Sequence, residues 1–113
     1  MSEIKLYRLS TGEDMVGRSV QGNEGEYNDH INFEYVEKPF VLIPMQGQPG
    51  QPMTIGFHPY IPYTKDTIIK IARDKIIATT NPDESILSAY QQNTSKIVTK
   101  TGPKLITWYK LML

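Results

Sequence analysis

The sequence predicts a mainly β domain, a small, strongly bent barrel of about five strands followed by a C-terminal helix. Short segments rich in Ile, Val, Phe and Tyr are separated by turn residues over most of the chain. Gly12 stands in a turn and Gly17 inside a strand segment, and a sharply curved sheet uses glycine at both kinds of place. The segment NPDESILSAYQQ then opens in the way a helix does.

The first half of the barrel is expected to be a hairpin and one long strand. In IKLYRLSTGEDMVGRSV, alternating residues flank the turn residues Ser-Thr-Gly-Glu-Asp, and Met15 to Val20 is the return strand. Gly17 in that strand predicts strong bending or a close approach of another backbone. The segment HINFEYVEKPFVLIPM follows as one long bent strand or two short ones, because Pro39 interrupts the pattern.

The second half begins with a Gly-, Gln- and Pro-rich segment, residues 46–52, which is expected to be a mobile loop. Residues 56–63, GFHPYIPY, place two prolines among aromatic residues, and proline cannot donate to a sheet, so an edge or loop surface is expected. Residues 67–80, TIIKIARDKIIATT, predict a strand pair around a very short turn. The barrel should therefore occupy about residues 3–80 of a single domain that covers residues 1–113.

The helix is expected over about residues 82–95. Asn81 can cap it, Pro82 fits its first position, and Glu84 three residues after Asn81 resembles a capping box. The segment from about residue 99 to 113 is a cationic tail whose KLITWYKLML can be a strand, a partner-binding segment or a disordered end.

Composition limits the classes of function. The chain has 113 residues, the size of one domain, and its 12 basic and 12 acidic residues give zero formal charge, so no overall field attracts a polyanion. The absence of cysteine excludes disulfides and thiolate sites and fits the cytoplasm. No apolar stretch approaches the roughly 18 residues of a membrane span, so no membrane association is expected.

Nothing in the sequence predicts an enzyme, a metal site or a cofactor. His30 and His58 lie in different segments and lack the spacing of a metal-binding pair. The acidic pairs at 13–14 and 83–84 fit a turn and a helix start. The glycines fall in turns and not at a strand-to-helix junction that cradles phosphate. We therefore expect no catalysis.

The polar segment NDHIN, residues 28–32, precedes an apolar strand and belongs to a wider pattern. Together with the glycines at 12 and 17, Asn28, His30, Ile31 and Asn32 resemble, in order, the first motif of the Sm-like family. Arg73-Asp74 stands where that family has Arg-Gly. The segments YRLSTGEDMVG, FHPYIPY, IKIARDKI and NPDES are similar to small Sm-like proteins of cyanophage origin and extend the resemblance over most of residues 4–90.

The resemblance implies a bent five-stranded barrel whose outer strands pair between subunits, forming a homo-oligomeric ring of about five to seven copies. It also implies binding of single-stranded RNA at the inner rim of that ring. His30 would stack on a base, Asn32 would read the base, Arg73 would supply a cation, and Asn28 would lie beside them. The protein would act in the cytoplasm of an infected bacterial host. Most relatives carry their main helix before the barrel, whereas this chain should carry it after.

Two functions remain open at this point. One is a non-catalytic RNA-binding or RNA-chaperone role, and the other is a structural, assembly or protein-interaction module of a phage that uses the same ring. The first motif favours RNA, whereas the zero charge and the Arg73-Asp74 pair favour protein contacts. Asn28 and Asp29 can equally close an ordinary Asx turn, and a turn arginine is commonly solvated. His58, Tyr60 and Tyr63 form either a second stacking or partner surface or the packing of a Pro/Tyr-rich loop.

Overall fold

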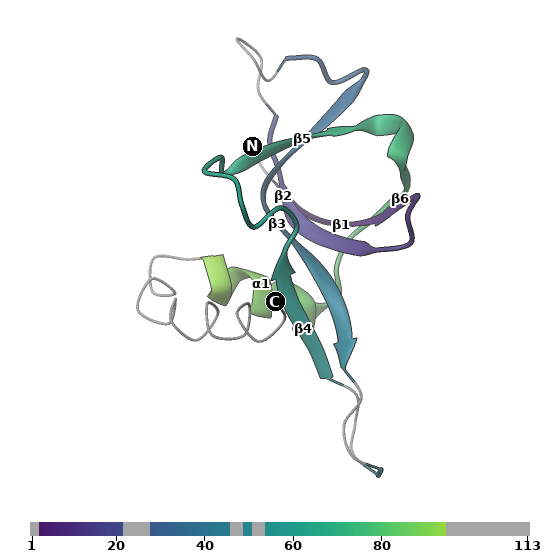
Figure 1. Cartoon of the computed structure of the whole chain (residues 1–113), viewed down its shortest axis with the longest axis vertical. Helices are drawn as coiled ribbons and strands as arrows, with labels where there is room; N and C mark the ends of the chain where they lie inside the picture. The colour runs from purple at the N-terminus through teal and green to yellow at the C-terminus, as the bar shows by residue number, and fades with distance from the viewer. Residues whose placement is uncertain (1–2, 22–27, 46–48, 51–53, 95–113) are drawn as a thin grey trace.

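The computed structural model describes residues 3–21, 28–45, 49–50 and 54–94. Most of the loop expected at 46–52, and the whole of the expected tail at 99–113, therefore lie outside the described residues. The described chain is mainly β with one C-terminal helix, as predicted (Figure 1). Its elements are β1 (Glu3–Leu9), β2 (Asp14–Ser19), β3 (Phe33–Met45), β4 (Thr54–Pro59), β5 (Ile68–Ala72), a 3-10 turn η2 (Arg73–Lys75), β6 (Ile76–Thr80) and α1 (Glu84–Thr94).

The strands form one antiparallel sheet in the order β4-β3-β2-β1-β6, and β5 pairs with the first half of β3. Figure 1 shows β1, β2, β3, β5 and β6 curving around a common interior, while the β3–β4 hairpin extends away from it. The structure describes six strands and not the expected five. The additional strand arises because β3 pairs with two separate strands, β4 and β5, which residues 60–67 connect. The edge position expected for the Pro-containing segment is confirmed for β4, which ends the sheet order.

Residues 67–80 form two strands around a very short turn, but these strands have different partners. β5 pairs with β3 from Phe33↔Ala72 to Glu37↔Ile68, whereas β6 pairs with β1. The prediction that these two strands pair with each other is therefore wrong. The 3-10 turn redirects the chain across the open side of the sheet, so that the two strands close the barrel instead of extending its edge.

The sheet bends where Gly17 faces β3. A Cβ atom built on Gly17 would lie 2.1 Å from Cγ1 of Val36 and 3.3 Å from Cα of Pro39. The β2–β3 register shifts between Val16 and Arg18, at this same point. The close backbone approach predicted for Gly17 is confirmed, and only a residue without a side chain fits there.

The kink expected at Pro39 is present within one continuous strand, because β3 runs through it. Lys38, just before the proline, has a φ of 50°, a left-handed conformation that is uncommon for a residue with a side chain. Beyond this kink β3 exchanges its partner, from β5 before it to β4 after it. Two backbone hydrogen bonds to the segment between β4 and β5 hold the kink. Lys38 N–H donates to Thr67 O at 2.7 Å, and Tyr60 N–H donates to Pro39 O at 3.0 Å.

Both faces of the curved sheet are covered with apolar side chains. The barrel interior is filled by one buried cluster, Tyr7, Leu9, Met15, Val36 and Ile71, with Tyr60, Ile69 and Ile76 packed against it. A second buried cluster lies between the sheet and α1 and consists of Val16, Phe40, Phe57 and Tyr90. Successive residues of a strand point to opposite faces, so each central strand serves both clusters.

The helix starts two residues later than expected, and its cap is a different residue. The Asp83 carboxylate accepts hydrogen bonds from Ile86 N–H and Ser85 Oγ, both at 2.9 Å, which is the arrangement of an N-cap. Asn81 is not the cap, because its Oδ1 accepts from Lys5 Nζ on β1 at 3.0 Å. At the other end, Thr94 closes the helix one residue before the expected Ser95.

Candidate functional site

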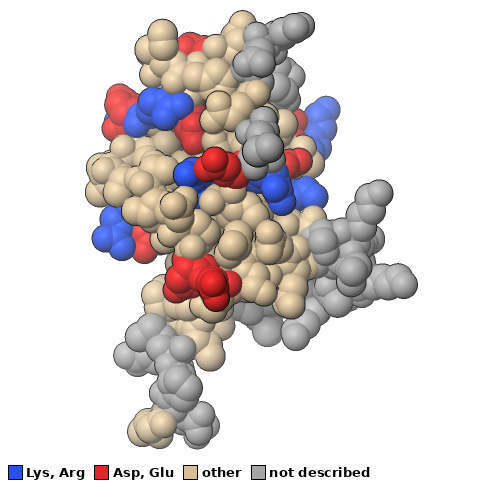
Figure 2. Space-filling view, turned by 180° about the vertical axis from the view of Figure 1, so that it is seen from behind, with Lys and Arg blue, Asp and Glu red and all other residues tan. Residues whose placement is uncertain are grey.

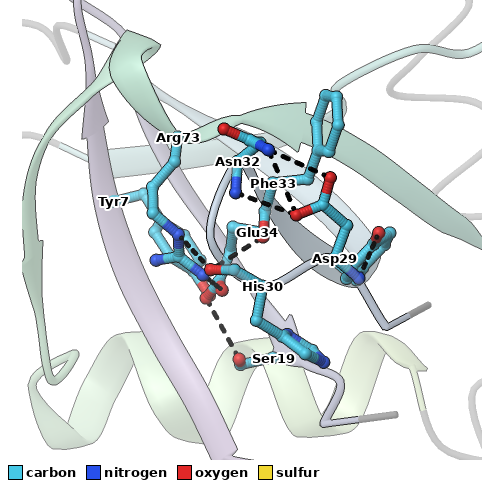
Figure 3. A network of polar contacts seen from close by, with 9 residues as sticks. Tyr7, Ser19, Asp29, His30, Asn32, Phe33, Glu34 and Arg73 are labelled. Atoms are coloured by element: carbon cyan, nitrogen blue, oxygen red, sulfur yellow. Dashed lines mark hydrogen bonds and ion pairs between the residues drawn. The ribbon is translucent and has the colours of Figure 1, made fainter. Parts of the chain in front are cut away.

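The turn before β3 is organised by Asp29. Its carboxylate accepts from the backbone N–H of Asn32 at 3.2 Å and from Nδ2 of Asn32 at 3.2 and 3.3 Å, and its carbonyl accepts from Phe33 N–H at 3.2 Å. These hydrogen bonds from Asn32, the side-chain bond first, hold the pKa of Asp29 below its ordinary value. The result is a closed Asx-type turn that fixes the orientation of the Asn32 amide. In Figure 3 the amide oxygen points away from Asp29.

Arg73 reaches this turn from the 3-10 turn after β5. Its backbone N–H donates to Asn32 O at 2.8 Å. Its guanidinium donates through Nε to His30 O at 2.9 Å and through Nη2 to Phe33 O at 3.1 Å and Glu34 Oε1 at 3.0 Å. Arg73 thus joins two segments about forty residues apart in sequence and is not simply solvated (Figure 3).

Beneath Arg73 lies a buried carboxylate that sequence reasoning missed. Glu34 is 8% exposed, and its Oε2 accepts from Tyr7 Oη at 2.6 Å and from Ser19 Oγ at 3.0 Å, while Oε1 faces Arg73. Burial raises the pKa of the Tyr7 hydroxyl far above its ordinary value, and the bond to Glu34 adds to the shift. The sequence does contain a signal for this burial. Alternate residues of a strand face the same side, and Glu34 is two residues before the core residue Val36, so it faces the barrel interior.

A hollow of about 460 Å³ opens between the two turns. It contains an amide, a guanidinium and a carboxylate among apolar groups, with Ile31 85% exposed at its rim. Such a mixture of a few fixed polar groups and apolar walls is typical of small ligand sites. The lining residues are Ile31, Asn32, Phe33, Ala72, Arg73 and Asp74.

Of the residues expected to bind RNA, the structure brings Asn32 and Arg73 together at this hollow. His30 takes part through its backbone carbonyl, while its ring packs edge-on against Tyr35, with ring centroids 5.3 Å apart and an angle of 81°. In Figure 3 that ring points away from Arg73 and Asn32. Asn28 is exposed at the start of the described segment and does not line the hollow.

A second, larger hollow of about 610 Å³ lies beside the chain that connects β4 to β5. Lys70 links the two, because it lines the second hollow and its Nζ is 4.4 Å from the centre of the Phe33 ring, which lines the first. The remaining lining residues are Tyr35, Ile61, Thr64, Lys65, Asp66, Thr67, Ile68 and Ile69.

The Pro/Tyr-rich segment combines packing with exposure. Tyr60 packs against the barrel cluster, as expected for simple packing of the loop. Tyr63 is 80% exposed and His58 is half-buried on β4. The three side chains therefore do not have one common environment.

The charged surface shows no large region of one sign on the face drawn in Figure 2, where acidic and basic side chains alternate. No group of three or more His, Asp or Glu side chains able to hold a metal ion occurs within residues 3–21, 28–45, 49–50 and 54–94. No helix among these residues is long and apolar enough to cross a membrane.

Comparison of the chain with models of known protein families gives no match, and comparison with curated proteins gives no similar sequence.

Proposed function

We propose that the protein is a non-catalytic, ring-forming Sm-like protein that binds single-stranded RNA in the cytoplasm. The observation that carries the proposal is the meeting of Asn32 and Arg73 at one open hollow, from two turns about forty residues apart in the sequence. An amide oxygen and a guanidinium N–H present an acceptor and a donor, the groups that hydrogen-bond the edge of an unpaired base. The exposed Ile31 and the Phe33 ring give the apolar walls on which a base can rest.

Ring formation is supported by the two ends of the sheet. Within the described residues, β4 and β6 each pair with a strand on one side alone. The sequence of β6, IIATT, carries no charge, and Ile77 on it is 64% exposed. An uncharged β-branched edge strand is a template for pairing with another chain, and head-to-tail pairing of β4 with β6 closes into a ring.

Light scattering coupled to size exclusion tests the ring. We expect a homo-oligomer of about five to seven subunits at micromolar concentration. Ile77→Lys should convert it to monomers, because a charge on the edge strand blocks edge-to-edge pairing. A monomeric wild-type protein, or a Lys variant that assembles unchanged, would contradict this mode of assembly.

Binding to short U-rich and A-rich single strands, measured by fluorescence anisotropy, tests the site. The double change His30→Ala, Asn32→Ala should remove binding while leaving the oligomer intact. The loss should come from Asn32, whose amide lines the hollow, because the His30 ring points away from the hollow and alanine keeps the carbonyl that holds Arg73. A bound base is worth about 1–3 kcal/mol, and each subunit of a ring contributes one copy. The double change Lys100→Ala, Lys104→Ala in the cationic C-terminal segment is the control.

The same measurement separates the second candidate function, a phage assembly or protein-interaction module. That candidate is favoured by the zero formal charge and by the mixed surface charge in Figure 2. If the lysine changes abolish RNA binding and the changes at 30 and 32 do not, RNA is held non-specifically by the C-terminal segment and the assembly role is the better interpretation.

A further inference from the structure

The buried carboxylate under the hollow divides its two oxygens between the barrel interior and Arg73. Oε2 accepts from Tyr7 and Ser19, both buried, and Oε1 accepts from Nη2 of Arg73 at the hollow. Burying a carboxylate costs free energy, and an apolar residue of similar size is often as stable or more stable at such a position. Packing alone therefore does not explain why the strand position next to the hollow is acidic.

The guanidinium of Arg73 is held on three sides. Its Nε–H is directed to His30 O, and the hydrogens of Nη2 are directed to Phe33 O and Glu34 Oε1. Among residues 3–21, 28–45, 49–50 and 54–94, none of these contacts uses Nη1, so we assign its N–H donors to a ligand. Since the planar group is fixed by the protein before any ligand arrives, little rotational freedom remains to be lost on binding.

The ion pair with Glu34 offsets the positive charge that Arg73 would otherwise give to the hollow. Glu34 forms an ion pair with it at 3.0 Å, and Asp74 lines the same hollow. Asp29 adds a further carboxylate behind Asn32. Lys70, over the Phe33 ring, is the nearby cation from β5. A phosphate group would thus meet about as much negative as positive charge, whereas an uncharged base edge is not opposed.

We propose that Glu34 is a positioning residue, which holds Arg73 and neutralises it so that the hollow accepts the uncharged edge of a base in preference to a phosphate. This deepens the proposed function and rests on it. It predicts that RNA binding depends on bases and only weakly on salt, although the ligand is a polyanion.

Glu34→Gln is the informative variant, because it keeps the shape of the side chain and removes its charge. Affinity is measured by anisotropy at several salt concentrations for an oligouridylate and for a ribose-phosphate oligomer without bases. We expect wild type to bind the base-free oligomer at least tenfold more weakly than the oligouridylate. Glu34→Gln should lose most of this preference, and its plot of log affinity against log salt should steepen by about 0.7 for each arginine released to a phosphate.

Glu37→Gln is the matched control. Glu37 lies on the same strand and also pairs with an arginine, Arg18, at 3.6 Å, but Arg18 does not line the hollow, whereas Arg73 does. Glu37→Gln removes the same charge and should leave both the preference and the salt slope unchanged. If Glu34→Gln and Glu37→Gln behave alike, the positioning role is refuted, whereas loss of binding in the double variant at 30 and 32 would still support the proposed function.

A measurement without ligand decides the structural half of the inference even if wild type binds neither oligomer. In a ¹H–¹⁵N NMR spectrum, the Nε–H of Arg73 should exchange slowly with solvent, and its signal is assigned as the one that disappears in Arg73→Lys. Glu34→Gln should speed this exchange at least tenfold, and Glu37→Gln should not. Unchanged exchange in Glu34→Gln would show that the backbone carbonyls hold Arg73 without the carboxylate and would overturn the proposal.

Discussion

Gly17 offers the sharpest test of how the sheet is built. In Gly17→Ala the new methyl group would meet Cγ1 of Val36 at 2.1 Å, more than 1 Å inside an ordinary carbon contact. Val36 is fully buried and cannot turn aside without displacing its neighbours, and Cα of Pro39 at 3.3 Å blocks the other direction. Overpacking of this kind costs about 1–3 kcal/mol. The smaller entropy of unfolded alanine offsets about 0.4–1 kcal/mol, so we expect a net loss of about 1–2 kcal/mol.

A double-mutant cycle, followed by urea denaturation with far-UV circular dichroism, isolates the cause. Val36→Ala alone should lose about 2 kcal/mol, the value for two buried methyl groups and a small cavity. In the double variant the two changes fit each other, so its loss should be at least about 1 kcal/mol less than the sum. Additivity would refute the contact as the reason for glycine.

Gly12→Ala is the control for this cycle. Gly12 has a φ of 101°, which disfavours a side chain, but nothing lies within 4 Å of the position of its Cβ. It should therefore lose stability through backbone strain and remain additive with Val36→Ala.

Two further predictions concern α1. Tyr90→Phe removes the hydroxyl that donates to Glu37 O at 2.7 Å and should lower the free energy of unfolding by about 1–2 kcal/mol in the same urea assay. The control Tyr63→Phe changes an exposed ring and should alter the free energy of unfolding by less than about 0.5 kcal/mol. Equal losses in the two variants would contradict the Tyr90–Glu37 contact. The cap hydrogen bonds, first that from Ile86 N–H, hold the pKa of Asp83 below its ordinary 3.8. The contribution of Asp83 to stability is accordingly present above that value and is lost as pH falls through the lowered pKa, so melting temperatures between pH 5 and pH 2 should fall more for wild type than for Asp83→Asn, which caps without titrating. Parallel pH profiles would rule out a charged cap at Asp83.

Sequence rules that concern neighbouring residues correctly predicted the strands and turns that depend on neighbouring residues. Turn residues and strand composition gave β1, β2 and a β3 that bends at Pro39, and the requirement for glycine in a crowded strand gave the contact at Gly17. They failed where a distant residue intervenes. Asn81 and Asp83 are both good caps by type, and the choice depends on Lys5, which lies at the other end of the barrel sequence and binds Asn81.

The sequence resemblance implied a site of Asn28, His30, Asn32 and Arg73, and of these four residues Asn32 and Arg73 line one hollow in the structure. The contacts that hold these two residues were not expected from the sequence. A turn arginine was expected to be solvated, but Arg73 pairs with Glu34, because β5 pairs with the start of β3. Pairing between strands so far apart in sequence leaves no local signal. Only the alternation of inward and outward residues along β3 indicated that the Glu34 carboxylate is buried.

The pairing of β1 with β6 also determines when the barrel can close during synthesis of the chain. Leu6 lies opposite Thr80, so the barrel cannot close on the ribosome before nearly the whole described chain has left the exit tunnel. Until then the nascent chain can form the β1–β2–β3–β4 meander, with Tyr7 and Leu9 lacking the cover that Ile71 gives them in the finished barrel. The growing chain thus exposes an apolar trough until β5, the 3-10 turn and β6 are made, and these elements both cover the trough and complete the hollow between Asn32 and Arg73.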